Sequence, residues 1–163
     1  MAYNFNADEI FKVAIRIEEN GAAFYRKAAS LQKEEDNQKF LNQLAKMEDN
    51  HKVSFEKMQK ELSEMEKGNT VFDPEEELGL YLSAMADAHG GEGDPKVAES
   101  LTQDQPMKDI LKIAISLEKE SILFYLGIKN LLPPKYGQDK IDNIIKEEQK
   151  HIAQLNTFLK KLQ

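Results

Sequence analysis

Apolar residues recur every three or four positions along four long stretches of the chain, which is the spacing of one face of an α-helix. The predicted helices cover residues 6–31, 36–67, 106–132 and 138–163. Asn6, with Glu9 three residues later, resembles a capping box at the start of the first helix. Gly68 and Pro133 predict the ends of the second and third helices. No stretch has the alternating pattern of a strand, so the predicted fold class is all-α.

The stretch between the second and third helices, residues 68–105, has a different character. Asp73 followed by Pro74 predicts the start of a short helix, because Asp caps a helix and Pro fits its first turn. Gly90 predicts the end of that helix, and residues 92–105 are expected to be a polar linker. A helix of about 26 residues spans roughly 39 Å. The intervening stretch is therefore long enough to cross from one end of a bundle to the other.

The two halves of the chain repeat each other at a constant offset of 100 residues. Residues 11–25 share Lys, Ala, Ile, Glu, Phe and Tyr with residues 111–125 at matching positions. Residues 38–62 share Gln, Lys, Glu, His, Lys and Leu with residues 138–162. The repeat predicts a single four-helix-bundle domain with internal pseudo-twofold symmetry and a long crossover between helices 2 and 3. Its parts are expected at about 6–67 for the first repeat, 68–105 for the crossover and 106–163 for the second repeat.

Net charge, the lack of long apolar runs and the absence of Cys exclude several classes of binding partner and of chemistry. The net charge of −7 makes nucleic acid a poor partner and disfavours an anionic membrane surface. The sequence has no apolar run of about 18 residues and no signal peptide at its start, so we expect no membrane span and a cytoplasmic location. The absence of Cys excludes disulfides, thiol catalysis and cysteine-bound metal within this chain.

Four glutamates and two histidines occupy symmetric positions on or beside the apolar stripes. They are Glu18, Glu48, His51, Glu118, Glu148 and His151. Within each half, the two glutamates lie equally far from the predicted turn, so antiparallel helices would bring them to one level. Each histidine follows the second glutamate by three residues, which places both on one helix face. All six side chains are therefore predicted to point into the bundle.

Buried carboxylates need compensating charge. Two of them about 5 Å apart repel by about 3 kcal/mol at an effective dielectric of about 20, and burial adds a desolvation cost. Two divalent cations would neutralise four carboxylates, and a donor set of carboxylate oxygen and imidazole nitrogen suits iron or manganese. The alternative is a polar core held only by hydrogen bonds.

The sequence resembles a known family at these positions. The matching segments are residues 14–18 (AIRIE), 24–25 (FY), 47–51 (MEDNH), 114–118 (AISLE), 124–125 (FY) and 148–151 (EQKH). They are similar to those of ferritin-like di-iron carboxylate proteins of the rubrerythrin type. This resemblance implies a ferritin-like bundle with a non-haem centre of two iron ions that reacts with oxygen or hydrogen peroxide.

The resemblance also implies a ligand set. Glu48 and His51 would bind one iron, and Glu148 and His151 the other. The remaining two glutamates, Glu18 and Glu118, would complete or bridge the sites.

Neighbouring residues have two interpretations each. Tyr25 and Tyr125 lie seven residues after a proposed ligand glutamate. They are candidate catalytic residues, through a hydrogen bond that orients a ligand carboxylate across the bundle, or they only pack in the core. Glu19 and Glu147 flank proposed ligands, but neither has a glutamate at its repeat partner. We therefore expect both to be solvated surface charges.

Two departures from the rubrerythrin pattern affect function. Rubrerythrins carry a rubredoxin-like iron site on four cysteines, so this chain would need an external electron donor. They also carry a second glutamate three residues after the ligand in helix 3, where this chain has Ser121.

The leading function is a peroxide- or oxygen-reducing oxidoreductase. The alternatives are a ferroxidase or iron-handling protein and a non-enzymatic metal-binding or sensor module. Exposed edges of such bundles often pair, so the fold is compatible with a homodimer, which the sequence itself does not show.

Overall fold

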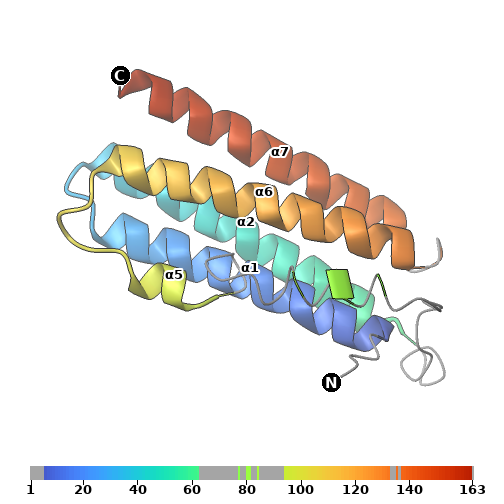
Figure 1. Ribbon diagram of the computed structural model, residues 1–163. Coiled ribbons are helices and arrows are strands. Elements are labelled where there is room, and N and C mark those ends of the chain that lie inside the picture. Colours follow the sequence, from blue (N-terminus) through green and yellow to red (C-terminus); the bar gives the residue numbers. More distant parts are fainter. Residues whose placement is uncertain are drawn as a thin grey trace.

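The computed structural model describes residues 6–62, 77, 80, 81, 84, 94–132, 135 and 137–162. Within these residues the structure has five helices, and the four long ones form a bundle, which confirms the predicted all-α class (Figure 1). The helices are α1 (Ala7–Ser30), α2 (Glu35–Lys60), α5 (Lys96–Glu99), α6 (Met107–Leu131) and α7 (Gln138–Lys161). None of the helices in the described part of the chain is both long enough and apolar enough to span a membrane.

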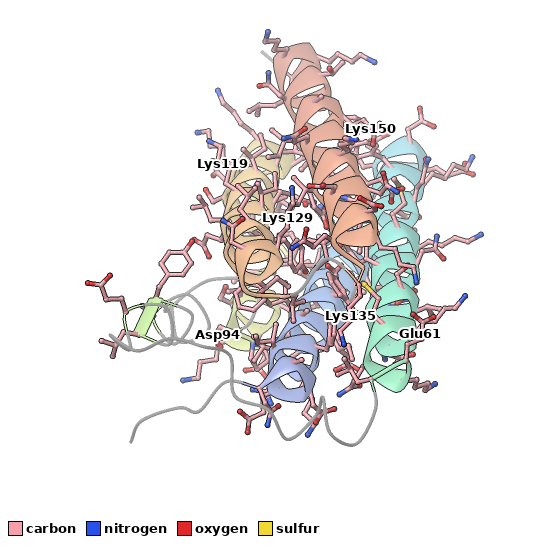
Figure 2. All side chains as sticks on the ribbon, turned by 90° about the vertical axis from the view of Figure 1, so that its right-hand side faces the viewer. Glu61, Asp94, Lys119, Lys129, Lys135 and Lys150 are labelled. Atoms are coloured by element: carbon pink, nitrogen blue, oxygen red, sulfur yellow. The ribbon has the colours of Figure 1, made fainter. Side chains whose placement is uncertain are left out.

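The bundle consists of two antiparallel hairpins whose turns lie at opposite ends (Figure 1). Helices α1 and α2 form one hairpin, and α6 and α7 form the other. Seen along the bundle from the α6–α7 turn, the four helices stand at four corners, with α1 beside α6 and α2 beside α7 (Figure 2). Neighbouring helices are therefore all antiparallel, and each face of the core receives side chains from both halves of the chain.

Helix α1 begins where the sequence predicts. The Asn6 side chain accepts a hydrogen bond of 2.9 Å from the backbone N–H of Glu9. Helix α2, in contrast, ends at Lys60, seven residues before the predicted end at Lys67. Leu62 turns into the core at this end of the bundle and is 5% exposed. The burial of Leu62 thus coincides with the end of α2, and the predicted helical residues 63–67 lie outside the described part of the chain.

Part of the predicted polar linker is a helix. The Asp94 side chain accepts a hydrogen bond from the backbone N–H of Lys96, and the short helix α5 follows. Leu101 beyond it is buried against the core, and Val97 packs there in part. One turn of helix with two apolar contacts is too short to produce a helical pattern in the sequence, so the linker prediction for residues 92–105 is corrected. The short helix predicted from Asp73 lies largely outside the described residues.

The core repeats the symmetry of the sequence. The order of buried, half-buried and exposed positions over residues 11–20 recurs unchanged over residues 111–120. Apolar side chains form two clusters in the bundle: one contains Phe11, Phe55 and Ile141, and the other contains Leu44, Leu111 and Leu155. The core of the bundle also contains buried glutamate and histidine side chains, called the polar layer below. The bundle therefore holds its polar groups inside an apolar surrounding.

Candidate metal centre

The six symmetric residues lie together in the interior of the bundle. Each is only 0–2% exposed. Helices α1 and α6 contribute one glutamate each, and helices α2 and α7 contribute a glutamate and a histidine each. They are Glu18 from α1, Glu48 and His51 from α2, Glu118 from α6, and Glu148 and His151 from α7. The structure therefore brings together the six side chains that the sequence pattern singled out.

Their donor atoms form two overlapping groups of four residues, each with all atoms within 4.8 Å of one another. One group is Glu18, Glu48, His51 and Glu148; the other is Glu48, Glu118, Glu148 and His151. Glu48 and Glu148 belong to both groups, whereas Glu18 and Glu118 belong to one each. Glu18 and Glu118 were expected either to complete a site or to bridge the two sites. The geometry favours the first role for them, and it favours the bridging role for Glu48 and Glu148.

Both imidazoles direct Nδ1 into the cluster. His51 Nδ1 lies 3.0 Å from Glu148 Oε1 and 3.4 Å from Glu18 Oε2. His151 Nδ1 lies 2.8 Å from Glu148 Oε2 and 3.2 Å from Glu48 Oε1. The two rings are nearly parallel, with centroids 5.6 Å apart. The arrangement gives each group one nitrogen and three carboxylates.

The residues fit a pair of bound metal ions. Several of their polar atoms are buried without a hydrogen-bond partner among the described residues. They are Glu18 Oε2, Glu48 Oε1, His51 Nδ1, Glu118 Oε2, both Glu148 oxygens and His151 Nδ1 and Nε2. Leaving a buried polar atom unsatisfied costs about 1–3 kcal/mol, and more for a charged group. Cations would satisfy these atoms, and the oxygen and nitrogen donors suit iron or manganese.

Without metal, the cluster retains protons. Burial raises the pKa of Glu18 and Glu118 well above the ordinary value. Burial alone would lower the pKa of His151, but the close carboxylates of Glu118 and Glu148 raise it to about 12. The pKa of His51 is also raised, against the effect of burial, by the carboxylates of Glu148 and Glu18. Burial would raise the pKa of Glu148, but the close imidazoles of His151 and His51 hold it well below its ordinary value. Metal binding here must displace protons.

Two tyrosines join the hairpins at the cluster. The Tyr25 hydroxyl of α1 donates to Glu118 Oε1 of α6, and the Tyr125 hydroxyl of α6 donates to Glu18 Oε1 of α1. Both tyrosines are almost completely buried. Each bond occupies one oxygen of its glutamate, and the other oxygen, Oε2, is the one without a partner among the described residues. These are hydrogen bonds across the bundle of the kind considered from the sequence.

Glu147 makes a contact with His51 that the sequence did not predict. Its Oε2 lies 2.6 Å from His51 Nε2, although its side chain is 47% exposed. About half of the Glu147 side chain is exposed, as predicted, but the contact with His51 was not predicted. Glu19, which is exposed to a similar extent, pairs with Lys52 at the surface. The signal in the sequence was the break in the repeat, because position 47 holds Met where position 147 holds Glu.

Ser121 does not supply a further carboxylate. It is 2% exposed, and its hydroxyl donates to the backbone oxygen of Leu117 in the same helix. The described cluster therefore contains four glutamates and two histidines.

Comparisons with known proteins give the family and the fold of the chain. The rubrerythrin family model matches residues 9–100, which is over half of the 163 residues, and the chain belongs to the rubrerythrin family. A solved structure from Thermotoga maritima, described as a ferritin-like diiron-carboxylate protein, superimposes with a TM-score of 0.71. It is 24% identical, and the match covers 98% of this chain and 97% of that one, so it shows the ferritin-like fold. No curated protein matches the chain. Family and buried carboxylate–histidine cluster together indicate di-iron binding.

Proposed function

We propose that this protein binds two iron ions in the bundle and reduces hydrogen peroxide or oxygen. The observation that carries the proposal is the pair of overlapping donor groups, buried and sharing two glutamates. Two ferrous ions bound there would supply the two electrons that reduce hydrogen peroxide to water or oxygen to hydrogen peroxide. Manganese has the same preference for these donors and is the alternative metal.

The residues of the chain provide charge balance and a dry site. Four carboxylates match the charge of two divalent cations. The apolar clusters around the polar layer exclude bulk water, which strengthens electrostatic interactions inside the bundle. The carboxylates thus hold cations where isolated charges would be strongly disfavoured.

Tyr25 and Tyr125 act as positioning residues in this proposal. Each holds Oε1 of a glutamate on the opposite hairpin and leaves Oε2 available to a cation. Such outer hydrogen bonds fix the orientation of a ligand carboxylate. The tyrosines would therefore hold Glu18 and Glu118 as ligands that each donate one oxygen.

We also propose the partners of the reaction. Because the chain has no Cys and hence no rubredoxin site of its own, electrons would come from a separate donor protein. The two repeats would act as one functional domain, since each donor group takes residues from both. A homodimer remains part of the proposal.

The test is a reaction of anaerobically iron-loaded protein with hydrogen peroxide, added in steps and followed by the near-ultraviolet spectrum. The proposal predicts that one peroxide oxidises two irons, and that the iron stays bound and reacts again after chemical re-reduction. The matched control is Lys46→Ala/Asn50→Ala, which alters only exposed positions of α2 and should react like the natural chain.

Other outcomes would contradict the proposal. Oxidised iron that leaves the site or accumulates beyond two per chain would establish a ferroxidase or iron-handling protein. Bound iron that peroxide and oxygen leave unchanged would establish a metal-binding or sensor module.

A further inference from the structure

The two metal sites differ in one contact on the far side of their histidines. We infer that Glu147 is a positioning residue that makes the group containing His51 bind a metal ion more tightly than the group containing His151. This inference rests on the proposed function. The inference goes beyond the proposed function because it predicts that the two metal ions bind in two steps and in a defined order.

The donor atoms themselves do not distinguish the groups. Each group has one histidine, one glutamate of its own and the shared pair Glu48 and Glu148. The glutamate that belongs to one group alone, Glu18 or Glu118, accepts a hydrogen bond from a tyrosine in both groups. Each histidine directs Nδ1 toward the carboxylates. The repeat therefore gives both groups the same kinds of donor residue and the same kind of tyrosine contact.

The outer side is different. His51 Nε2 lies 2.6 Å from Glu147 Oε2, whereas His151 Nε2 is buried and has no hydrogen-bond partner among the described residues. The repeat explains the difference, because the position equivalent to 147 is 47, and it holds Met. A thioether cannot provide the charged acceptor that a carboxylate provides.

This contact has a direct consequence for metal binding. A neutral imidazole that binds metal through Nδ1 carries its proton on Nε2. A carboxylate that accepts this proton fixes the tautomer and the ring orientation and makes Nδ1 a stronger donor. Loss of such a partner weakens metal affinity by roughly 10- to 100-fold. The group with His51 should therefore fill first.

The test uses cobalt(II), which is stable in air as the divalent ion and absorbs in the visible when bound. Metal-free protein is titrated with cobalt(II), and crystals loaded with one equivalent are measured at the cobalt absorption edge. The natural chain should show two steps separated by roughly 10-fold or more. The single equivalent should lie next to His51.

The variants remove the carboxylate beside His51 or add one at the equivalent position, 47. Glu147→Met should weaken the first step by roughly 10- to 100-fold and spread one equivalent over both groups. Met47→Glu should tighten the second step. Glu147→Met/Gln149→Glu restores the charge of α7 at an exposed position without the contact, and it should behave like Glu147→Met alone. Thermal unfolding of the metal-free variants checks that each one folds.

The outcomes separate this inference from the proposed function. Equal filling of both groups in the natural chain, or full recovery by the charge-restoring variant, would overturn the role of Glu147 and leave the metal site intact. Filling of the His151 group first would reverse the assignment. A folded natural chain that binds no cobalt or iron would overturn both the site and this inference.

Discussion

At the scale of single residues, Tyr25 and Tyr125 show how the site depends on contacts between hairpins. Each hydroxyl reaches a glutamate on the other hairpin, at the level of the buried polar layer. The spacing of seven residues from a ligand glutamate indicated the face of the helix. It could not show which carboxylate the hydroxyl meets, because that depends on how α1 and α6 pack.

Removing one of these hydroxyls should destabilise the protein. Tyr25→Phe keeps the ring but leaves Glu118 Oε1 buried without its donor, which should lower the free energy of unfolding by about 1–3 kcal/mol. Urea unfolding measures the change. Tyr81→Phe is the control, because the Tyr81 side chain is partly exposed and its hydroxyl donates to the Leu123 backbone oxygen outside the cluster. Equal stability of both variants would contradict the importance of the crossing bond.

The protonation of the cluster predicts an unusual pH dependence for the metal-free protein. The raised pKa of Glu18 and Glu118 means that stability declines once pH exceeds their ordinary value of 4.5. The stabilising contribution of His51 and His151, whose pKa values are raised, is complete below 6.5 and is lost as pH rises beyond it. The contribution of Glu148, whose pKa is lowered, is lost as pH falls below 4.5.

The free energy of unfolding of metal-free protein should therefore be larger near pH 5.5 than near pH 8. Added metal should stabilise the protein more at pH 8, because fewer protons compete for the same atoms. Urea titrations at both pH values, with and without metal, measure this. A metal-free protein that is more stable at pH 8 would contradict the protonated cluster.

At the scale of elements, the sequence predicted most of the bundle because its signals are long and repeated. The four helices follow from apolar periodicity, and the repeat at an offset of 100 residues gives the pairing of the two halves. The early end of α2 and the existence of α5 could not be predicted in this way. At each of these places a single leucine, Leu62 or Leu101, packs into a core assembled from other helices, and such a contact leaves no periodic pattern in the sequence.

The symmetry of the sequence identified the residues of the cluster and hid one of its contacts. The symmetry of the two halves singled out the six buried residues. It also dismissed Glu147, because its partner position holds Met47, although its contact with His51 is made between α7 and α2. Comparison of the two repeats identifies residues that both halves share, and it cannot identify a functional residue that only one half has.

The start of α7 depends on one glycine. Gly137 has φ 95°, a left-handed conformation, and a Cβ built there would lie 2.9 Å from Met58 Sδ. Gly137→Ala should lower the free energy of unfolding by about 1–3 kcal/mol, because the backbone strain adds to the crowding. Gly137→Asn tolerates this conformation better and should cost less. Unfolding by urea compares the three proteins, and an unchanged stability of Gly137→Ala would contradict this account of the turn.

At the scale of the whole molecule, the metal centre lies between the hairpins. One donor group takes residues from α1, α2 and α7, and the other takes residues from α2, α6 and α7. Neither hairpin alone contains a complete group. Metal binding should therefore hold the two halves of the chain together, and the buried carboxylates that disfavour the metal-free bundle would stabilise the loaded one.

The most direct test of this account is the number and position of bound iron ions. Protein loaded anaerobically with iron(II) and passed through a desalting column should retain two irons per chain. Crystals measured at the iron absorption edge should show two peaks, one beside each histidine Nδ1. Glu48→Gln, which alters a ligand shared by both groups, should lose most of the iron, while Lys46→Ala/Asn50→Ala retains it. A folded natural chain with no iron, or with iron bound elsewhere, would contradict the central claim.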